Sequence, residues 1–174
     1  MGGTGQENFK WSYGVRFIPD VIDRAKWRNT LTYQVNSRLS IGIEYNPIAG
    51  KASPLANFVA IKETKKRPAL ILGTSSDRIG TPSGQSFYAT FSKNLQRETS
   101  LPISPYFGIT YSSFQDRFRP IGGINIQYPK NFSSTFLFDG VHGHQLYNYS
   151  FKRHQFGFLL VRNKTAGVSY NVLF

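Results

Sequence analysis

TAGVSYNVLF, the run from Thr165 to Phe174, alternates apolar side chains with small ones. In an extended strand its two sets of side chains point to opposite faces, a period of two that an α-helix cannot produce. The run therefore predicts a β-strand with one apolar face and one small, polar face. The apolar set is Ala166, Val168, Tyr170, Val172 and Phe174, and the other set is Gly167, Ser169 and Asn171.

The same alternation recurs along the whole chain. In Lys10–Ile18, the residues Ser12, Gly14 and Arg16 alternate with aromatic and apolar ones, and the pair Asn36-Ser37 separates two further runs as a hairpin turn would. We predict an all-β antiparallel barrel of about 12 strands, with eight or ten longer strands as alternatives, in which the C-terminal strand pairs with the first. The other predicted strands lie near residues 27–35, 39–45, 55–62, 69–74, 86–92, 106–112, 117–128, 132–138, 147–151 and 156–160.

The connections between these segments differ in length. Residues 46–54 (NPIAGKASP) and 75–84 (SSDRIGTPSG) have the Gly, Pro and Ser density of surface loops, and residues 19–25 (PDVIDRA) form another connector. As far as residue 93, long connections alternate with short ones. This asymmetry is typical of outer-membrane barrels, which have short turns on one side and longer loops on the other.

The composition favours a membrane protein. The 174 residues predict one domain, with residues 1–9 as a flexible N-terminal segment. Aromatic residues make up 16% of the chain and charged residues 17%, where about 25% charged is usual in a soluble domain. No apolar run of about 18 residues is present, so a membrane would have to be crossed by a barrel. MGGTGQENFK lacks the apolar region of a signal peptide, and we expect a mature chain.

The C-terminal strand resembles the terminal signal of bacterial outer-membrane β-barrels, in which alternating hydrophobic residues lead to a final Phe. This resemblance implies that Tyr170, Val172 and Phe174 form an assembly signal. Ser169 stands where that family usually has Gly, which is a departure from the pattern. The resemblance also implies the outer membrane of a Gram-negative bacterium as location, with the barrel-assembly machinery, membrane lipid and lipopolysaccharide as partners.

In a membrane, the direction of each face follows from charge. Arg or Lys facing lipid costs about 2–4 kcal/mol at the bilayer midplane, so the aromatic face must point outward and the basic residues inward. Aromatic residues at strand ends, Tyr106 among them, would then form interfacial girdles. A soluble ligand-binding barrel is the alternative, in which the aromatic face would form the core.

The net charge of +12 predicts an anionic partner. A lumen of one sign of charge attracts ions of the opposite sign, so we predict a small channel for anionic solutes. In size, strand number and charge the chain resembles small outer-membrane porins that pass acidic oligosaccharides. Glu44 is the one acid predicted on the inward face, and the predicted anion-binding residues of the lumen are Arg16, Arg28, Arg38, Lys62, Arg119 and Lys152.

An outer-membrane lipid-modifying enzyme, a deacylase or acyltransferase, is the second hypothesis. The candidate groups for a nucleophile, base and orienting residue are Asp139, His142, His144, Ser150, His154 and the set Ser112, Ser113 and Asp116. The His-x-Ser pattern of that family is absent, because His142 is followed at the second position by His144. A metal site formed by Asp139, His142 and His144 is a further hypothesis, because His and carboxylate side chains are common metal ligands. Without cysteine there is no thiolate ligand, and no cofactor is predicted. Nucleic-acid binding is disfavoured because the basic and aromatic residues lie on opposite faces.

Overall fold

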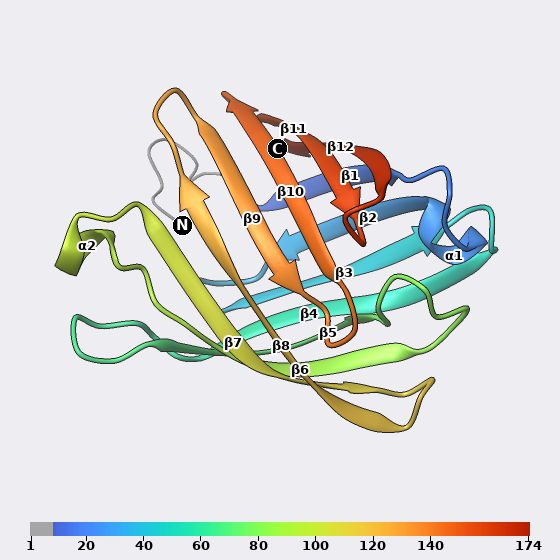
Figure 1. The fold of residues 1–174 in the computed structure, drawn as a ribbon, viewed down its shortest axis with the longest axis horizontal. Helices are drawn as coiled ribbons and strands as arrows, with labels where there is room; N and C mark the ends of the chain where they lie inside the picture. The colour runs from blue at the N-terminus through green and yellow to red at the C-terminus, as the bar shows by residue number, and fades with distance from the viewer. Residues whose placement is uncertain (1–8) are drawn as a thin grey trace.

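The chain folds into a closed antiparallel barrel of 12 strands (Figure 1). The computed structural model describes residues 9–174, apart from the side chain of Arg97, so the predicted flexible segment lies almost wholly outside the described residues. The predicted fold class and strand number are confirmed. The strands are β1 (Trp11–Phe17), β2 (Trp27–Gln34), β3 (Leu39–Asn46), β4 (Lys51–Ile61), β5 (Ala69–Ser76), β6 (Gln85–Ser92), β7 (Ile103–Ser112), β8 (Arg117–Gln127), β9 (Phe132–Phe138), β10 (Gly143–Phe151), β11 (His154–Val161) and β12 (Thr165–Leu173).

The barrel closes where β12 pairs with β1, as the sequence predicts. In this ladder Tyr13 lies opposite Val172 and Phe17 lies opposite Val168. The backbone of Trp11 exchanges two hydrogen bonds with that of Phe174, at 2.9 and 3.0 Å. No strand of the barrel therefore has a free edge.

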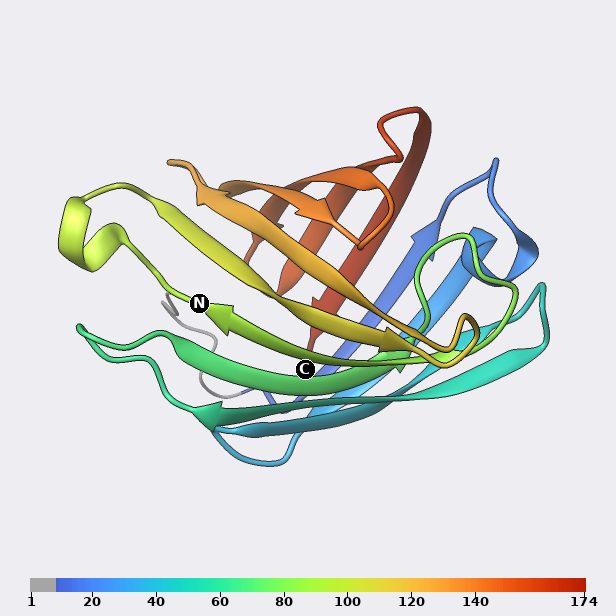
Figure 2. The same cartoon turned by 60° about the horizontal axis from the view of Figure 1, so that its bottom comes forward.

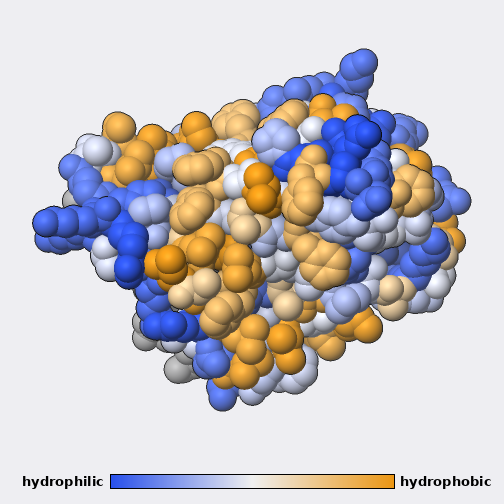
Figure 3. Space-filling model, turned by 90° about the horizontal axis from the view of Figure 1, so that it is seen from below, coloured by the Kyte–Doolittle hydropathy of each residue, from blue (hydrophilic) through white to orange (hydrophobic). Residues whose placement is uncertain are grey.

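The outer surface of the barrel wall is apolar. Figure 3 shows hydrophobic side chains across the middle of one face, with the most hydrophilic ones toward its edges. Phe107 and Phe118 are 69% and 70% exposed, and exposed aromatic or aliphatic residues occur on every strand. The predicted outward direction of the apolar face is confirmed. Tyr106 is an exception: it alternates with Phe107 and its side chain lines an interior cavity, so its placement in an outer girdle was wrong.

The two ends of the barrel differ. We call the end where β1 begins and β12 ends the terminal end, and the opposite one the capped end. At the capped end lies the short helix α1 (Asp23–Lys26), while α2 (Gln96–Thr99) lies at the terminal end (Figure 1). In the described part of the chain, no helix is long and apolar enough to span a bilayer.

Two predicted loops have a different structure. Of the predicted loop 46–54, only residues 47–50 form a tight turn, because β4 already begins at Lys51 and pairs with β3 from there on. Ser75 and Ser76 still belong to β5, and residues 77–84, which we call the β5–β6 loop, fold toward the barrel interior beside α1 instead of into solvent (Figure 2). The connections therefore do not divide into long ones at one end of the barrel and short ones at the other, as the sequence had predicted.

A candidate anion site inside the barrel

Two arginines lie side by side on the inner wall. Arg16 of β1 is directly opposite Arg28 of β2 in the ladder, and both side chains line the same cavity. Arg28 Nη2 lies 2.6 Å from Glu44 Oε2, an ion pair without hydrogen-bond alignment, and Glu44 is only 1% exposed. The side chain of Arg16 has no hydrogen bond or ion pair with any described residue. Like charges directly opposite each other destabilise a sheet. The pair is therefore poorly explained by folding alone.

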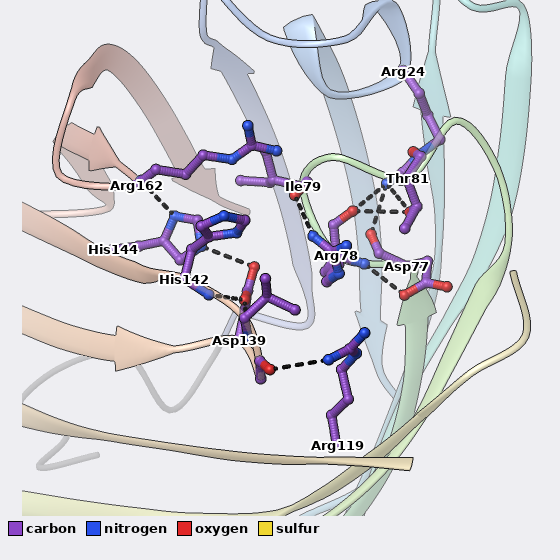
Figure 4. Close-up of polar contacts among 12 residues, drawn as sticks. Arg24, Asp77, Arg78, Ile79, Thr81, Arg119, Asp139, His142, His144 and Arg162 are labelled. Carbon is purple, nitrogen blue, oxygen red and sulfur yellow. Dashed lines mark hydrogen bonds and ion pairs between the residues drawn. The ribbon is translucent and has the colours of Figure 1, made fainter. Parts of the chain in front are cut away.

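A third arginine fastens the β5–β6 loop over these two. Arg24, from α1, is buried and donates hydrogen bonds to the carbonyl oxygens of Asp77, Arg78 and Thr81 at 2.7–2.8 Å (Figure 4). Its Nη2 also donates to Thr81 Oγ1 at 3.1 Å. Burial lowers the pKa of the Arg24 guanidinium, which nevertheless stays charged near neutral pH because an arginine starts from a very high value. Its four hydrogen bonds are all to neutral oxygens, and none of them is an ion pair.

The carboxylate of Asp77 is held by the barrel wall. It accepts hydrogen bonds from the hydroxyl groups of Ser112 and Ser86 and from the backbone N–H of Arg78 at 2.8 Å. These contacts fix the start of the β5–β6 loop from the side opposite Arg24. The negative charge of Asp77 is thereby solvated by neutral donors, and no described arginine forms an ion pair with it.

Asp139 and His144 form a second buried pair across the cavity. His144 Nε2 lies 2.9 Å from Asp139 Oδ2, and its Nδ1 accepts a hydrogen bond from the backbone N–H of Arg162 at 3.3 Å (Figure 4). Burial alone would raise the pKa of Asp139. The hydrogen bonds from His144 and from the backbone N–H groups of Val141 and His142 outweigh burial, so the pKa is lowered. Asp139 is therefore ionised at neutral pH, and both of its carboxylate oxygens accept hydrogen bonds.

Arg78 is the basic residue of the β5–β6 loop at the cavity, which Asp77 and Ile79 of that loop also line. Its Nη1 makes a long hydrogen bond of 3.4 Å to the carbonyl oxygen of Ile79, and its Nε is buried without an acceptor in residues 9–174. Arg119 of β8 lies nearby, bonded to Gln115 and to the carbonyl oxygen of Gly140. Arginines from the wall and from the loop thus surround one space (Figure 4).

That space consists of two adjoining cavities. The larger has a volume of about 340 Å³ and is lined by Arg16, Arg24, Arg28 and Arg78. The smaller, of about 190 Å³, is lined by Arg119, Tyr88 and Tyr106. Both are lined by Arg78, Asp77 and Asp139, so they meet beneath the β5–β6 loop.

The six predicted lumen residues fall into two groups. Arg16, Arg28 and Arg119 line the interior cavities. Arg38, Lys62 and Lys152 are exposed in connections at the terminal end, away from the other three. Their alternation with apolar neighbours continues past the last residue of the strand, so the pattern alone does not show where the wall ends.

The predicted assembly signal lies on the outside of the last strand. The Tyr170 hydroxyl lies 2.7 Å from His154 Nδ1, and the Tyr170 ring packs on Phe156. Val172 lies opposite Tyr13 in the closing ladder, and Phe174 is half exposed. All three residues are thus on the face that the resemblance requires.

Several residues of the site were not found from the sequence. Arg24 and Arg78 lie in connections, where no periodicity shows the direction of a side chain. The cavity also has an apolar side formed by Leu137, Leu146, Leu159 and Val161. These four follow the inward parity of their strands, so applying the period of two to every residue would have found them.

His144 and Ser112, two of the candidate catalytic groups, are engaged in other contacts. Both ring nitrogens of His144 are occupied, one by Asp139 and the other by a backbone N–H, so His144 has none free to activate a nucleophile. The Ser112 hydroxyl donates a hydrogen bond to Asp77, and Asp116 accepts a hydrogen bond from the Tyr111 hydroxyl. Among residues 9–174, no group of three or more His, Asp or Glu side chains is placed to hold a metal ion.

No protein-family model matches this chain, and no curated protein sequence does so. A functional assignment therefore depends on the surface and the interior described above.

Proposed function

We propose that this protein is a transmembrane β-barrel of a bacterial outer membrane that admits small anionic solutes to an arginine-lined interior. The observation that carries the proposal is the contrast between the two faces of the wall. Outside, exposed apolar side chains surround the barrel; inside are the guanidinium groups of Arg16, Arg28 and Arg119.

The outer face supports insertion in a bilayer. A soluble monomer rarely exposes an apolar patch of more than a few hundred Å², because such a surface promotes association. Here exposed Phe, Tyr, Ile and Leu side chains occur around the entire wall. In a closed barrel every strand is hydrogen-bonded to a neighbour on each side, and a bilayer core demands such internal pairing of backbone groups.

The inner face supports a preference for anions. The aspartates of the larger cavity are solvated by hydroxyl groups, by backbone N–H groups and by His144, and only Arg28 has an acidic partner. Arg16, Arg24 and Arg78 therefore form no ion pair with a described residue, and the five arginines that line the two cavities outnumber the two aspartates there. In a low-dielectric wall, such uncompensated charge raises the local concentration of anions.

Planar-bilayer recording tests the proposal. The protein, purified in detergent and reconstituted, should conduct, and the reversal potential in a KCl gradient should show a preference for chloride over potassium. Arg16→Gln combined with Arg119→Gln should move the permeability ratio toward one, because two interior charges are lost. Arg28 is left unchanged, since its removal would strand the buried carboxylate of Glu44.

The matched control is Arg38→Gln combined with Lys152→Gln, which removes the same charge from exposed connections. We expect this control to affect selectivity much less than the interior variant does. Equal effects would show that net charge, not the arginine-lined interior, sets the preference. A protein that stays monodisperse without detergent would refute the membrane proposal itself.

A further inference from the structure

The larger cavity has two chemically different sides. The guanidinium groups of Arg16 and Arg28 enter it from β1 and β2, and that of Arg78 enters from the β5–β6 loop. Besides Ala25 of α1 and Ile79 of the β5–β6 loop, its apolar side chains come from β9, β10 and β11, which lie around the ring on the far side of β12. These are Leu137, Leu146, Leu159 and Val161.

The basic side has unused hydrogen-bond donors. The Nε atoms of Arg16, Arg28 and Arg78 are all buried, and none has an acceptor in residues 9–174. Burying a polar group without a partner costs free energy, roughly 1–3 kcal/mol for each group. The guanidinium groups that carry these three atoms line one cavity, so a ligand that supplies acceptors to these groups would offset part of this cost.

The acids near these donors do not supply acceptors to them. Asp77 is bonded to Ser86 and Ser112, and Asp139 is bonded to His144. Glu44 forms its ion pair with Arg28 and none with Arg16 or Arg78. An incoming oxyanion would therefore not displace an existing partner of Arg16 or Arg78.

We propose that this cavity is a binding site for a small amphiphilic oxyanion, a phosphate or carboxylate joined to a compact hydrocarbon body. The inference rests on the proposed function and narrows its class of solute. The oxyanion accepts hydrogen bonds from Arg16, Arg28 and Arg78, whose planar donors suit phosphate and carboxylate oxygens. The hydrocarbon part lies against the leucines.

The size of the cavity limits the ligand. About 340 Å³ is at the lower end of the range of small-molecule pockets, about 300–1,000 Å³. One aromatic ring with its anionic group is therefore a suitable probe, and a long acyl chain is not. Arg24 closes the site from the capped end by holding the β5–β6 loop.

Isothermal titration calorimetry on the protein in non-ionic detergent tests the site, with protein-free micelles as the blank for partitioning. The probes are phenyl phosphate, benzoate, inorganic phosphate, phenol and benzyl alcohol. We expect phenyl phosphate to bind at least about tenfold more tightly than inorganic phosphate or phenol, because each of the latter uses one side of the cavity only. Benzoate should likewise bind more tightly than benzyl alcohol.

Arg16→Gln and Arg78→Gln should each weaken binding of phenyl phosphate by about tenfold or more, since each removes a charged donor. Arg38→Gln, an exposed charge at the terminal end, is the matched control and should leave it unchanged. Unaltered circular dichroism and heat-modifiable migration would show that the variants are folded. Because Arg16 is in a strand and Arg78 in a loop, a folding defect in one leaves the other as the test.

Two results would overturn the inference: equal affinities for phenyl phosphate and inorganic phosphate, or unchanged binding in both interior variants. Conductance recorded on the same preparations separates this failure from that of the proposed function. A barrel that prefers anions but binds neither aromatic probe refutes the site alone. A barrel that binds both probes but does not conduct refutes the channel and supports the site.

Discussion

At the scale of the residue, the interior is shaped by glycines that face tyrosines. Gly73 of β5 lies directly opposite Tyr88 of β6, and Gly123 of β8 lies opposite Tyr106 of β7. The ring of Tyr88 lies across the space where a side chain at Gly73 would be, and its hydroxyl donates to Asn57 Oδ1 at 2.5 Å. These rings narrow the lumen on the side of β5–β8.

Gly73→Ala should destabilise the barrel. The new Cβ would lie 2.6 Å from Cε2 of Tyr88, whose hydrogen bond to Asn57 fixes the ring. We expect a loss of about 1–3 kcal/mol in the free energy of unfolding, the usual cost of overpacking. Urea unfolding in detergent, followed by circular dichroism, measures this change.

Gly143→Ala is the control for this prediction. Gly143 is also a strand residue, but a Cβ there would meet nothing closer than 3.4 Å. We expect its unfolding free energy to equal or exceed that of the wild type, because alanine restricts the unfolded chain. If both variants unfold at the same urea concentration, the close packing of Tyr88 on Gly73 does not contribute to stability.

At the scale of the element, the β5–β6 loop is a cap fastened at two points. Arg24 holds its carbonyl groups from α1, and the hydroxyl groups of Ser86 and Ser112 hold Asp77 from the wall. Arg162, from the connection between β11 and β12, packs over Gly80, whose φ of +112° favours glycine. Removing the first of these fastenings should release the loop.

Arg24→Met keeps much of the side-chain length of Arg24 but cannot donate to the carbonyl groups of Asp77, Arg78 and Thr81. Each buried carbonyl left unpaired costs roughly 1–3 kcal/mol, so we expect the loop to open. The measurement is limited trypsin digestion with mass spectrometry of cleavage after Arg78, which should become faster. Single-channel conductance should rise if the cap narrows the lumen.

Lys26→Gln removes a charge from the same helix without touching the loop, because Lys26 pairs only with Asp23, at 3.3 Å. Its digestion pattern should match that of the wild type. Arg24→Lys, which keeps the charge and one or two of the donated bonds, should give an intermediate rate. Equal cleavage in Arg24→Met and in the wild type would show that Asp77 alone keeps the loop in place.

The strands could be predicted because their sequence pattern is local. The fold of the β5–β6 loop could not be predicted in this way. Alternation within a few residues gives a strand and its two faces, which is how the barrel, its 12 strands and the pairing of the last strand with the first were inferred. The fold of residues 77–84 depends instead on Arg24, which is more than 50 positions away in the sequence. Gly, Pro and Ser density predicts a loop but says nothing of the side on which it packs.

The candidate site was predictable to the same extent. Strand parity places Arg16, Arg28 and Arg119 inside. The positions of Arg24 and Arg78 at the cavity could be found only from the structure, because the backbone of a connection can turn a side chain in any direction. Glu44 was predicted inward, but its pairing with Arg28 follows from the register of β2 and β3, which alternation alone leaves open.

At the scale of the whole molecule, an apolar surface encloses a polar interior, the reverse of a soluble protein. In a bilayer the outer side chains should tolerate charge least near the middle of the wall. Ile109, midway along the ladder between β6 and β7, is 53% exposed, while Phe114 is 48% exposed in the turn between β7 and β8. The two positions differ in depth and hardly in exposure.

Ile109→Arg should therefore impair the barrel far more than Phe114→Arg. Arg facing lipid costs about 2–4 kcal/mol at the midplane and about 0–1 kcal/mol near the interface. The measurement is the free energy of unfolding in lipid vesicles, or the yield of heat-modifiable barrel on refolding into them. Equal, small effects of the two substitutions would indicate that both side chains face water, and this would contradict the membrane proposal.

The pairing of β1 with β12 also determines when the barrel can close during folding. Ser12 bonds to Asn171, 159 positions later, so the first strand waits for the last before its second edge is paired. Contacts this distant in sequence form slowly. Meanwhile an incomplete barrel exposes two unpaired edges, which favour aggregation. We therefore expect the unfinished chain to be prone to aggregation until β12 is synthesised and its pairing with β1 removes both free edges.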